Sequence, residues 1–256
     1  MKKWTAAAIR SSKGKQKLAC LTAYDFATAR MIDRCGLELI LVGDSLAMTM
    51  LGYETTLPVT MEEMLHHTAA VTRGVTGALV VGDMPFMSYQ VSIESAVANA
   101  GRFLKEAGAD AVKIEGGAVR VELIRTLVGN GIPVLGHIGL TPQSIRQVGG
   151  FKVQGKQSAQ ARQLREDAAA LQQAGAFALV LECIPAELGR AISQSLDIPT
   201  IGIGAGPHCD GQILVTHDLL GLYGDLQPRF VKQYADLGAA MIDAFTAYRQ
   251  DVEAGG

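Results

Sequence analysis

Residues 111–117 read AVKIEGG, an apolar run with the pattern of a buried strand that nevertheless carries a lysine and a glutamate. Side chains two residues apart on a strand point to the same face, so Lys113 and Glu115 enter one interior while Val112 and Ile114 face the other side. Burying an ion costs several kcal/mol, and charged residues are rarely buried unless they are paired. This stretch therefore predicts either a structural ion pair or a polar ligand site inside the fold.

Other apolar runs of the chain also end in polar residues. They read LILVGDS at 39–45, ALVVGD at 78–83, PVLGH at 133–137 and ALVLE at 178–182. Helical patterns separate these runs, and further strand patterns lie at 18–22, 199–203 and 212–215. Eight alternating strands and helices in about 250 residues predict the α/β class and a (β/α)8 barrel, or TIM barrel. We expect one domain over residues 1–256, with the polar strand ends gathered at one mouth of the barrel.

A doubly wound open sheet is the alternative fold, because GIGAG at 202–206 resembles the start of a dinucleotide-binding fingerprint. The sixth position of that fingerprint requires glycine, and the sequence has Pro207 there. The run also comes late in the chain, whereas the fingerprint belongs to an early strand, turn and helix. A glycine-rich barrel loop that lets a ligand approach the backbone is the better interpretation.

The overall composition limits the classes of partner. The formal net charge of -2 offers no basic field for nucleic acid, and no run of lysine and arginine indicates a membrane surface. We therefore expect small-molecule substrates, copies of the chain itself as partners, and a cytoplasmic location. The four cysteines show no CxxC spacing in a chain of this size, which favours reduced thiols.

Three consecutive strand patterns end in the carboxylates of Asp44, Asp83 and Glu115. Neighbouring barrel strands would bring these groups together, where they repel one another unless a cation joins them. Hard oxygen ligands without clustered cysteine or histidine select Mg²⁺ rather than zinc, so the pattern predicts a magnesium site. Lys113 beside it pairs with a protein carboxylate, binds a substrate carboxylate or forms a Schiff base, and the residues alone leave these roles open.

His137 and Glu182 end the next two strand patterns. At the far side of the same mouth, either side chain is suited to act as an acid or a base. His137 is equally suited to be a buried polar anchor. The residues alone therefore leave the choice of base open.

The chain resembles the ketopantoate hydroxymethyltransferase family along nearly its whole length. The shared stretches are LTAYD from Leu21, LVGDSL from Leu41, LPVT from Leu57, HHTAAV from His66, VKIEGG from Val112, GHIGLTPQS from Gly136, KVQGK from Lys152, LVLECIP from Leu179 and IGIGAGPHCDGQILVTHDLLGL from Ile201. The resemblance implies a barrel of the phosphoenolpyruvate/pyruvate type. It also implies transfer of a hydroxymethyl unit from 5,10-methylenetetrahydrofolate to 3-methyl-2-oxobutanoate, giving 2-dehydropantoate in pantothenate and coenzyme A synthesis by Mg²⁺-assisted enolate formation.

The resemblance also assigns roles to residues. It implies that Asp44, Asp83 and Glu115 are ligands of one Mg²⁺ per subunit, and that Glu182 is the proton acceptor. The same resemblance places the contacts to the 2-oxoacid on Asp44, Ser45, Asp83 and Lys113. We add His137 as a group that orients or hydrogen-bonds substrate. A homodecamer is the assembly that the resemblance implies.

Two alternatives have the same barrel. One is another Mg²⁺-dependent lyase or aldolase that forms or cleaves a carbon–carbon bond of a different 2-oxoacid and needs no folate. The other is a noncatalytic barrel that binds a metabolite, which should have lost Glu182 or a metal ligand. Both alternatives are disfavoured because the full set of residues is present.

Overall fold

The computed structural model describes residues 3–150, 152–222 and 230–255. The chain divides into two compact units, Met1–Ile213 and Leu214–Gly256, and each is described by itself. The expectation of one undivided domain over residues 1–256 stays a prediction. The long loop expected between Gly139 and Gln157 contains Phe151, which lies outside the described residues.

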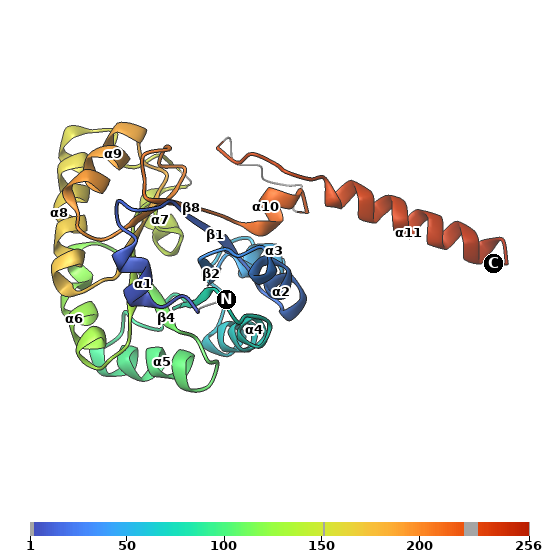
Figure 1. Ribbon diagram of the computed structural model, residues 1–256, viewed down its shortest axis with the longest axis horizontal. Coiled ribbons are helices and arrows are strands. Elements are labelled where there is room, and N and C mark those ends of the chain that lie inside the picture. Colours follow the sequence, from blue (N-terminus) through green and yellow to red (C-terminus); the bar gives the residue numbers. More distant parts are fainter. Residues whose placement is uncertain (1–2, 151, 223–229, 256) are drawn as a thin grey trace. The chain divides into compact units, whose positions relative to one another are not determined.

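Eight strands form a closed barrel in which each strand neighbours the next one along the chain (Figure 1). This finding confirms the (β/α)8 barrel expected from the alternation of strand and helix patterns, and it excludes the doubly wound open sheet. The strands are β1 Leu18–Thr22, β2 Leu39–Val42, β3 Leu79–Asp83, β4 Ala111–Glu115, β5 Val134–Gly139, β6 Ala178–Glu182, β7 Thr200–Ile203 and β8 Gly211–Leu214.

Helices of the first unit surround these strands, and their bounds follow the capping signals of the sequence (Figure 1). Thr60 and Glu63 form the expected capping box at the start of α4, and Ser92 caps α5. The helices are α1 Ala6–Ser11, α2 Phe26–Arg34, α3 Leu46–Thr49, α4 Met61–Gly74, α5 Ile93–Lys105, α6 Val121–Gly129, α7 Ile145–Val148, α8 Ser158–Ala174 and α9 Ala186–Ser195, with 3₁₀ turns η1 Ala118–Arg120 and η2 Pro142–Ser144.

The second unit contains α10 Thr216–Leu220 and α11 Leu237–Glu253. The backbone N–H of Tyr234 donates to the carbonyl of Leu219 at 2.8 Å, which ties the segment before α11 to α10. The closing helix was expected from Phe230, and it begins instead at Leu237, where Asp236 caps its first turn. Among the described residues, no helix combines the length and apolar character needed to cross a membrane.

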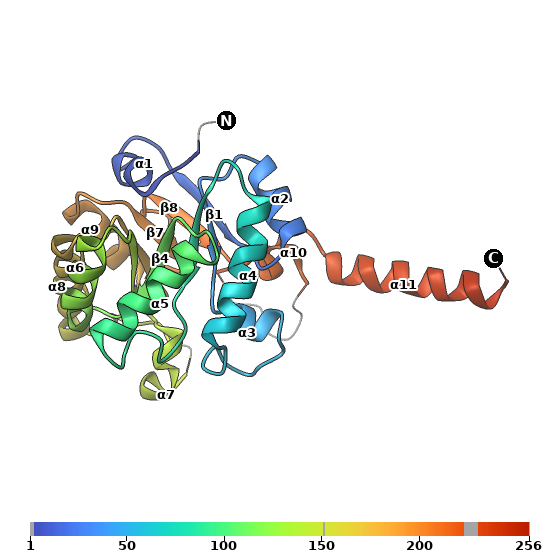
Figure 2. The same ribbon diagram turned by 90° about the horizontal axis from the view of Figure 1, so that it is seen from below.

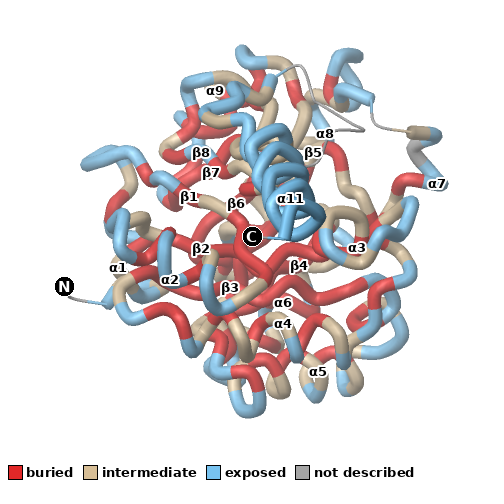
Figure 3. Tube along the Cα trace, turned by 90° about the vertical axis from the view of Figure 1, so that its right-hand side faces the viewer, coloured by how far each residue is buried: buried red, intermediate tan, exposed pale blue. Residues whose placement is uncertain are grey.

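The barrel has an inner apolar core and an outer one. Leu39, Leu79 and Val81 point inward and pack with Ile9 of α1, whereas Ile40 and Val80 point outward under the helices. This alternation follows the two-residue period of a strand. β2, β3 and β4 are buried along their whole length, as the red tube in Figure 3 shows, whereas β1 and β8 each contain an exposed residue.

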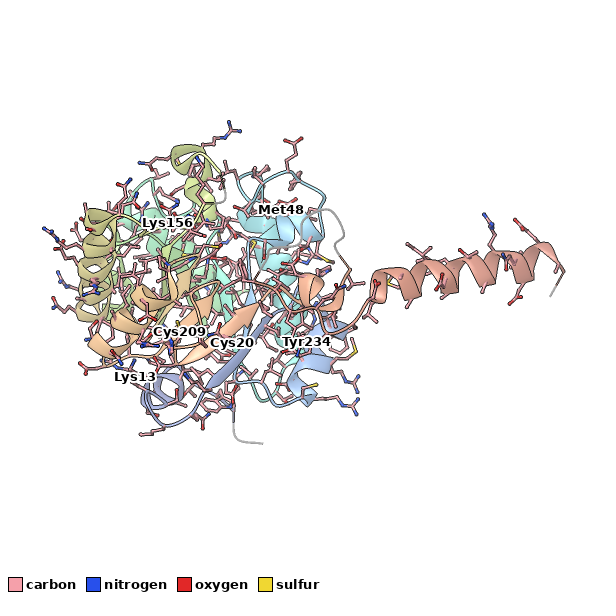
Figure 4. All side chains as sticks on the ribbon, turned by 90° about the horizontal axis from the view of Figure 1, so that it is seen from above. Lys13, Cys20, Met48, Lys156, Cys209 and Tyr234 are labelled. Atoms are coloured by element: carbon pink, nitrogen blue, oxygen red, sulfur yellow. The ribbon has the colours of Figure 1, made fainter. Side chains whose placement is uncertain are left out.

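The two ends of the barrel differ in what lies over them. Figure 2 shows α3 and α7, which follow β2 and β5, at one end and α1 at the other. Figure 4 likewise places Met48 and Lys156 at one end and Lys13 and Cys209 at the opposite end. The end with α3 and α7 is the one to which the strands' carboxyl ends lead, and it carries the polar residues singled out in the sequence.

Candidate active site

The inward face of the central strands changes from apolar to charged at their carboxyl ends. On β3 the inward residues run from Leu79 and Val81 to Asp83, and on β4 they run from Ala111 to Lys113 and Glu115. The side-chain period of two puts every second residue of a strand on the same face. The first inward residues of such a strand therefore pack in the core of the barrel, and its last inward residues supply charged groups to the site.

Strand register determines which of these residues are neighbours. Asp83 pairs with Lys113 across β3 and β4, and Glu115 pairs with His137 across β4 and β5. On the next pair of strands, Glu182 lies opposite Gly139. β5 was expected to end at His137, but it continues to Gly139, so His137 lies inside the strand rather than at its end.

Three carboxylates and one ammonium group form a buried cluster at this mouth. The Nζ atom of Lys113 donates to both oxygens of Asp83, at 2.7 and 2.8 Å, and lies 3.5 Å from Oε1 of Glu115. The backbone N–H of Asp44 donates to Oδ2 of Asp83 at 3.0 Å. Each of the four residues is no more than 4% exposed, so these charges interact with little screening by water.

This cluster shifts the pKa of each of its members. Burial and the nearby charges of Asp83 and Glu115 raise the pKa of Asp44 well above its usual range. Burial opposes ionisation of Asp83 and raises its pKa despite the lysine beside it. Burial also disfavours the Lys113 charge, but the surrounding carboxylates outweigh it and raise the pKa of that amine. The cluster thus places three acidic groups and one basic group at close range, where burial makes negative charge on all three acids costly.

His137 lies between two carboxylates. Its Nδ1 atom is 3.4 Å from Oε1 of Glu115, and its Nε2 atom is 3.2 Å from Oε2 of Glu182. Neither ring nitrogen makes a hydrogen bond within the described part of the chain, so His137 meets the two carboxylates at ion-pair distance only. Burial and Lys113 disfavour its charge, yet these two carboxylates raise the pKa of His137 to about 9.

Glu182 is the more accessible of the acid and base candidates. Its side chain is 17% exposed, whereas the side chain of His137 is 2% exposed. The carbonyl of Glu182 accepts the backbone N–H of Leu140 at 2.8 Å. A side chain at Gly139 would place its Cβ atom 2.2 Å from that carbonyl oxygen, so glycine is required beside Glu182.

Ser45 lies at the start of α3, directly after Asp44, and is half-buried. Its hydroxyl is 2.8 Å from the hydroxyl of Tyr24, which follows β1. The Ser45 hydroxyl thus lies beside Tyr24, next to the carboxylate cluster that begins with Asp44. The substrate contact expected of Ser45 stays a prediction.

Sequence reasoning assigned no role to two residues of this site, Gln143 and Tyr89. Gln143 lies in η2 after β5 and is 5% exposed, and its amide donates to Oδ2 of Asp44 at 3.1 Å. The hydroxyl of Tyr89, in the loop after β3, donates to Oε1 of Gln143 at 2.6 Å. The signal was present in the stretch GHIGLTPQS, where Pro142 starts a short turn soon after a buried strand and Gln143 is the second residue of that turn.

The oxygen-rich cluster is the place in the described chain best suited to a hard cation by the chemistry of its donors. As the side chains stand, however, no group of three or more His, Cys, Asp or Glu residues within the described ranges could hold a metal ion. Lys113 is bound to both oxygens of Asp83. Asp83 must therefore share its oxygens with Lys113 or rotate before the three carboxylates can bind one cation.

Two solved structures share this fold. Phosphonopyruvate hydrolase, in a complex with oxalate and Mg²⁺, superposes with a TM-score of 0.64 at 13% sequence identity and covers 99% of this chain and 88% of its own. The trigonal crystal form of 2,3-dimethylmalate lyase, a member of the PEP mutase/isocitrate lyase superfamily, gives 0.62 at 16% identity and covers 99% and 86%. These similarities show that the chain shares the barrel fold of these two proteins.

Sequence comparison identifies the family. The profile of ketopantoate hydroxymethyltransferase matches residues 3–256. The chain is 58% identical over 246 residues to 3-methyl-2-oxobutanoate hydroxymethyltransferase of Clostridium novyi (strain NT), covering 96% of this chain and 90% of that protein. It is 56% identical over 255 residues to the enzyme of the same name from Syntrophus aciditrophicus (strain SB), covering 99% and 94%. The chain therefore belongs to the ketopantoate hydroxymethyltransferase family and is an enzyme.

Proposed function

We propose that this enzyme transfers a hydroxymethyl unit from 5,10-methylenetetrahydrofolate to 3-methyl-2-oxobutanoate and yields 2-dehydropantoate, with one Mg²⁺ per subunit. The observation that carries the proposal is the buried cluster of Asp44, Asp83, Lys113 and Glu115, with Glu182 as a further carboxylate beyond His137. A 2-oxoacid needs a cationic site for its two oxygens and a separate base for its C3 proton. The mouth of the barrel offers both within one site.

The donor set fits Mg²⁺. Three buried carboxylates face one ammonium group, and burial together with their mutual repulsion raises the pKa of Asp44. A divalent cation would relieve that repulsion, because Mg²⁺ prefers oxygen ligands and is usually held by one or two carboxylates together with substrate oxygens. The phosphonopyruvate hydrolase structure with the same fold contains Mg²⁺ and oxalate, which supports the choice of metal. We assign Asp44, Asp83 and Glu115 as the residues that would hold the ion.

The remaining polar residues would bind and activate the substrate. When bound, Mg²⁺ supplies Lewis-acid polarisation of the 2-oxo group. Lys113 places a fixed positive charge beside the substrate carboxylate, and Ser45 contacts the substrate from the start of α3. Glu182 removes the C3 proton, and the electron pair left on C3 forms a bond to the one-carbon unit. Both carbon–nitrogen bonds of that unit break, with their electron pairs going to the folate nitrogens. Water supplies the hydroxyl of the product, and the C3 proton and one proton of that water end on the two nitrogens. His137, 3.2 Å from Glu182, orients that carboxylate and hydrogen-bonds substrate.

The test of this function is product formation from purified components. The enzyme is incubated with 3-methyl-2-oxobutanoate and 5,10-methylenetetrahydrofolate, and 2-dehydropantoate is measured by NMR. We expect product only when both substrates and Mg²⁺ are present, and loss of product after treatment with a chelator. Product that persists after complete chelation would contradict the metal assignment. Absence of product under all conditions would favour the lyase or the noncatalytic barrel.

Lys113 is expected to remain unmodified when the enzyme is reduced with borohydride in the presence of 3-methyl-2-oxobutanoate. Its Nζ atom donates to both oxygens of Asp83 and carries no lone pair for attack on a carbonyl carbon. Peptide mapping by mass spectrometry checks this, with a Schiff-base aldolase reduced in parallel as the positive control. A substrate mass on Lys113 would show that it forms an imine.

We propose further that the enzyme is a homo-oligomer, a homodecamer by its family resemblance, in the cytoplasm. Large apolar residues recur every three or four positions along α11, which puts them on one side of that helix: Leu237, Met241, Phe245, Tyr248 and Val252. No described residue of α11 is buried. This apolar stripe supports contact with another copy of the chain, and light scattering on the full chain would measure the assembly.

A further inference from the structure

We propose that Gln143 is the positioning residue that fixes the carboxylates of Asp44 and Glu115 in the orientation that binds the metal ion, and that Tyr89 acts through Gln143. The inference rests on the proposed metal site. Gln143 does not touch the proposed reacting atoms, so its role is to hold other groups. Its position in η2 lets it reach the ends of three strands from the loop that follows a fourth.

Every donor of Gln143 is used at the site. Its backbone N–H donates to Oε2 of Glu115 at 3.1 Å. Its side-chain amide donates to Oδ2 of Asp44 at 3.1 Å and to the carbonyl of Met84 at 2.9 Å. Asp44 follows β2, Met84 follows β3 and Glu115 ends β4. Gln143, a single residue in the loop after β5, therefore joins all three strand ends that carry the proposed metal ligands.

Tyr89 determines which way the amide of Gln143 faces. The backbone N–H of Glu115 donates to the Tyr89 hydroxyl at 3.3 Å, and that hydroxyl lies 2.6 Å from Oε1 of Gln143. The hydroxyl has one proton, and the short contact is where it is donated. The side-chain amide of Gln90 also donates to Oε1 of Gln143, at 3.3 Å. Because Oε1 is the acceptor of both donors, the N–H₂ group must face Asp44. The guanidinium of Arg120 lies 5.2 Å from the centre of the Tyr89 ring and holds that ring in place.

The carboxylates of Asp44 and Glu115 therefore each have one oxygen that is bonded to Gln143 and one that Gln143 does not contact. Gln143 donates to Oδ2 of Asp44 and Oε2 of Glu115, so its own contacts leave Oδ1 of Asp44 and Oε1 of Glu115 open. Oε1 of Glu115 also lies 3.5 Å from Nζ of Lys113 and 3.4 Å from Nδ1 of His137, and a cation there would share it with them. A neutral amide achieves this without adding a positive charge that would compete with the metal ion. Groups that orient metal ligands in this way typically contribute about 10- to 100-fold to metal affinity.

The experiment measures metal binding by the full chain without substrates. Mn²⁺ binding is followed by electron paramagnetic resonance and Mg²⁺ binding by calorimetry, for the wild type and for Gln143→Met. Methionine keeps the length of the side chain but removes its donors and its acceptor. We expect the Kd for both ions to rise by about 10- to 100-fold, together with a changed Mn²⁺ spectrum.

A second variant, Tyr89→Phe, keeps Gln143 but removes the shorter of the two hydrogen bonds to its Oε1, leaving the 3.3 Å bond from the amide of Gln90. We expect a smaller rise in Kd than for Gln143→Met, and no further rise when the two changes are combined, because Tyr89 acts through Gln143. If Gln143→Met fails to fold, Tyr89→Phe still carries the test. If the effects of the two changes on the Kd add up in the double variant, Tyr89 does not act through Gln143.

The matched control is Gln172→Met, at the opposite end of the barrel. Oε1 of Gln172 accepts the backbone N–H groups of Asp197 at 2.7 Å and Ile198 at 3.2 Å, just before β7. Its loss should lower the melting temperature and leave metal affinity unchanged. Wild type that binds neither ion would overturn the metal site and this inference with it. If the wild type binds the metal ions and both Gln143→Met and Tyr89→Phe bind them with the same Kd, this inference alone would be overturned.

Discussion

Replacing Asp83 with asparagine is expected to lower kcat by on the order of 10³-fold while the protein stays folded. Polarisation by a metal ion is worth several kcal/mol, and every 1.36 kcal/mol is about tenfold in rate. Stability should survive because Lys113 keeps a carboxylate partner: Oε1 of Glu115 lies 3.5 Å from its Nζ atom. Removing one of three crowded carboxylates also reduces their repulsion. Steady-state kinetics and thermal unfolding of the same preparation measure the two effects.

Asp110→Asn is the matched control for this prediction. Asp110 immediately precedes β4, at its amino end, accepts the backbone N–H of Val80 at 2.9 Å and pairs with Lys3 at 3.0 Å. Its replacement should cost stability and leave turnover intact, which is the reverse of the Asp83 result. Near-normal turnover of Asp83→Asn, or its failure to fold, would overturn the assignment of Asp83 as a metal ligand in a cluster of three crowded acidic groups.

Replacing Glu182 with glutamine is expected to slow removal of the C3 proton of 3-methyl-2-oxobutanoate by about 10²- to 10⁴-fold, the usual loss for a general base. Glu182 is the carboxylate outside the cluster of Asp44, Asp83 and Glu115, and its side chain is 17% exposed to an incoming substrate. Glutamine keeps the shape of the side chain and removes its basicity. The measurement is exchange of the C3 proton in D₂O with Mg²⁺ and without folate, followed by NMR, because it separates proton removal from carbon transfer.

Two further variants make this measurement decisive. Glu187→Gln changes an exposed carboxylate in the first turn of α9, paired with Arg190 at 3.6 Å, and should exchange at the wild-type rate. His137→Asn tests the competing base, whose side chain is 2% exposed and lies between Glu115 and Glu182. If His137→Asn stops exchange and Glu182→Gln does not, the base is His137. A partial loss in His137→Asn fits a group that orients Glu182.

Much of the barrel was predictable because its pattern is local. A strand reveals itself by apolar residues over a few positions, and capping residues such as Thr60 and Glu63 indicate where a helix begins. Consecutive parallel strands of a barrel pair with one another, so polar residues at their ends must meet at one mouth. That is why Asp83, Lys113 and Glu115, predicted as neighbours, lie within hydrogen-bonding or ion-pair distance.

The ends of elements were less predictable because tertiary contacts set them. β5 continues beyond His137 because Ile138 and Gly139 pair with Leu181 and Glu182 of β6. This pairing cannot be read from residues 133–139 alone. It places His137 inside the strand, with Glu115 on one side and Glu182 on the other.

The sequence by itself determined the class of fold, the family and which charged residues share the mouth, because strand period and strand order act over short ranges of chain. Only the tertiary structure decided that Gln143 and Tyr89 belong to the site. The amide of Gln143 bonds to Asp44, 99 residues away, and its acceptor is met by Tyr89, 54 residues away. Both residues lie in loops, whose path over the barrel depends on packing and hydrogen bonds that no local pattern encodes.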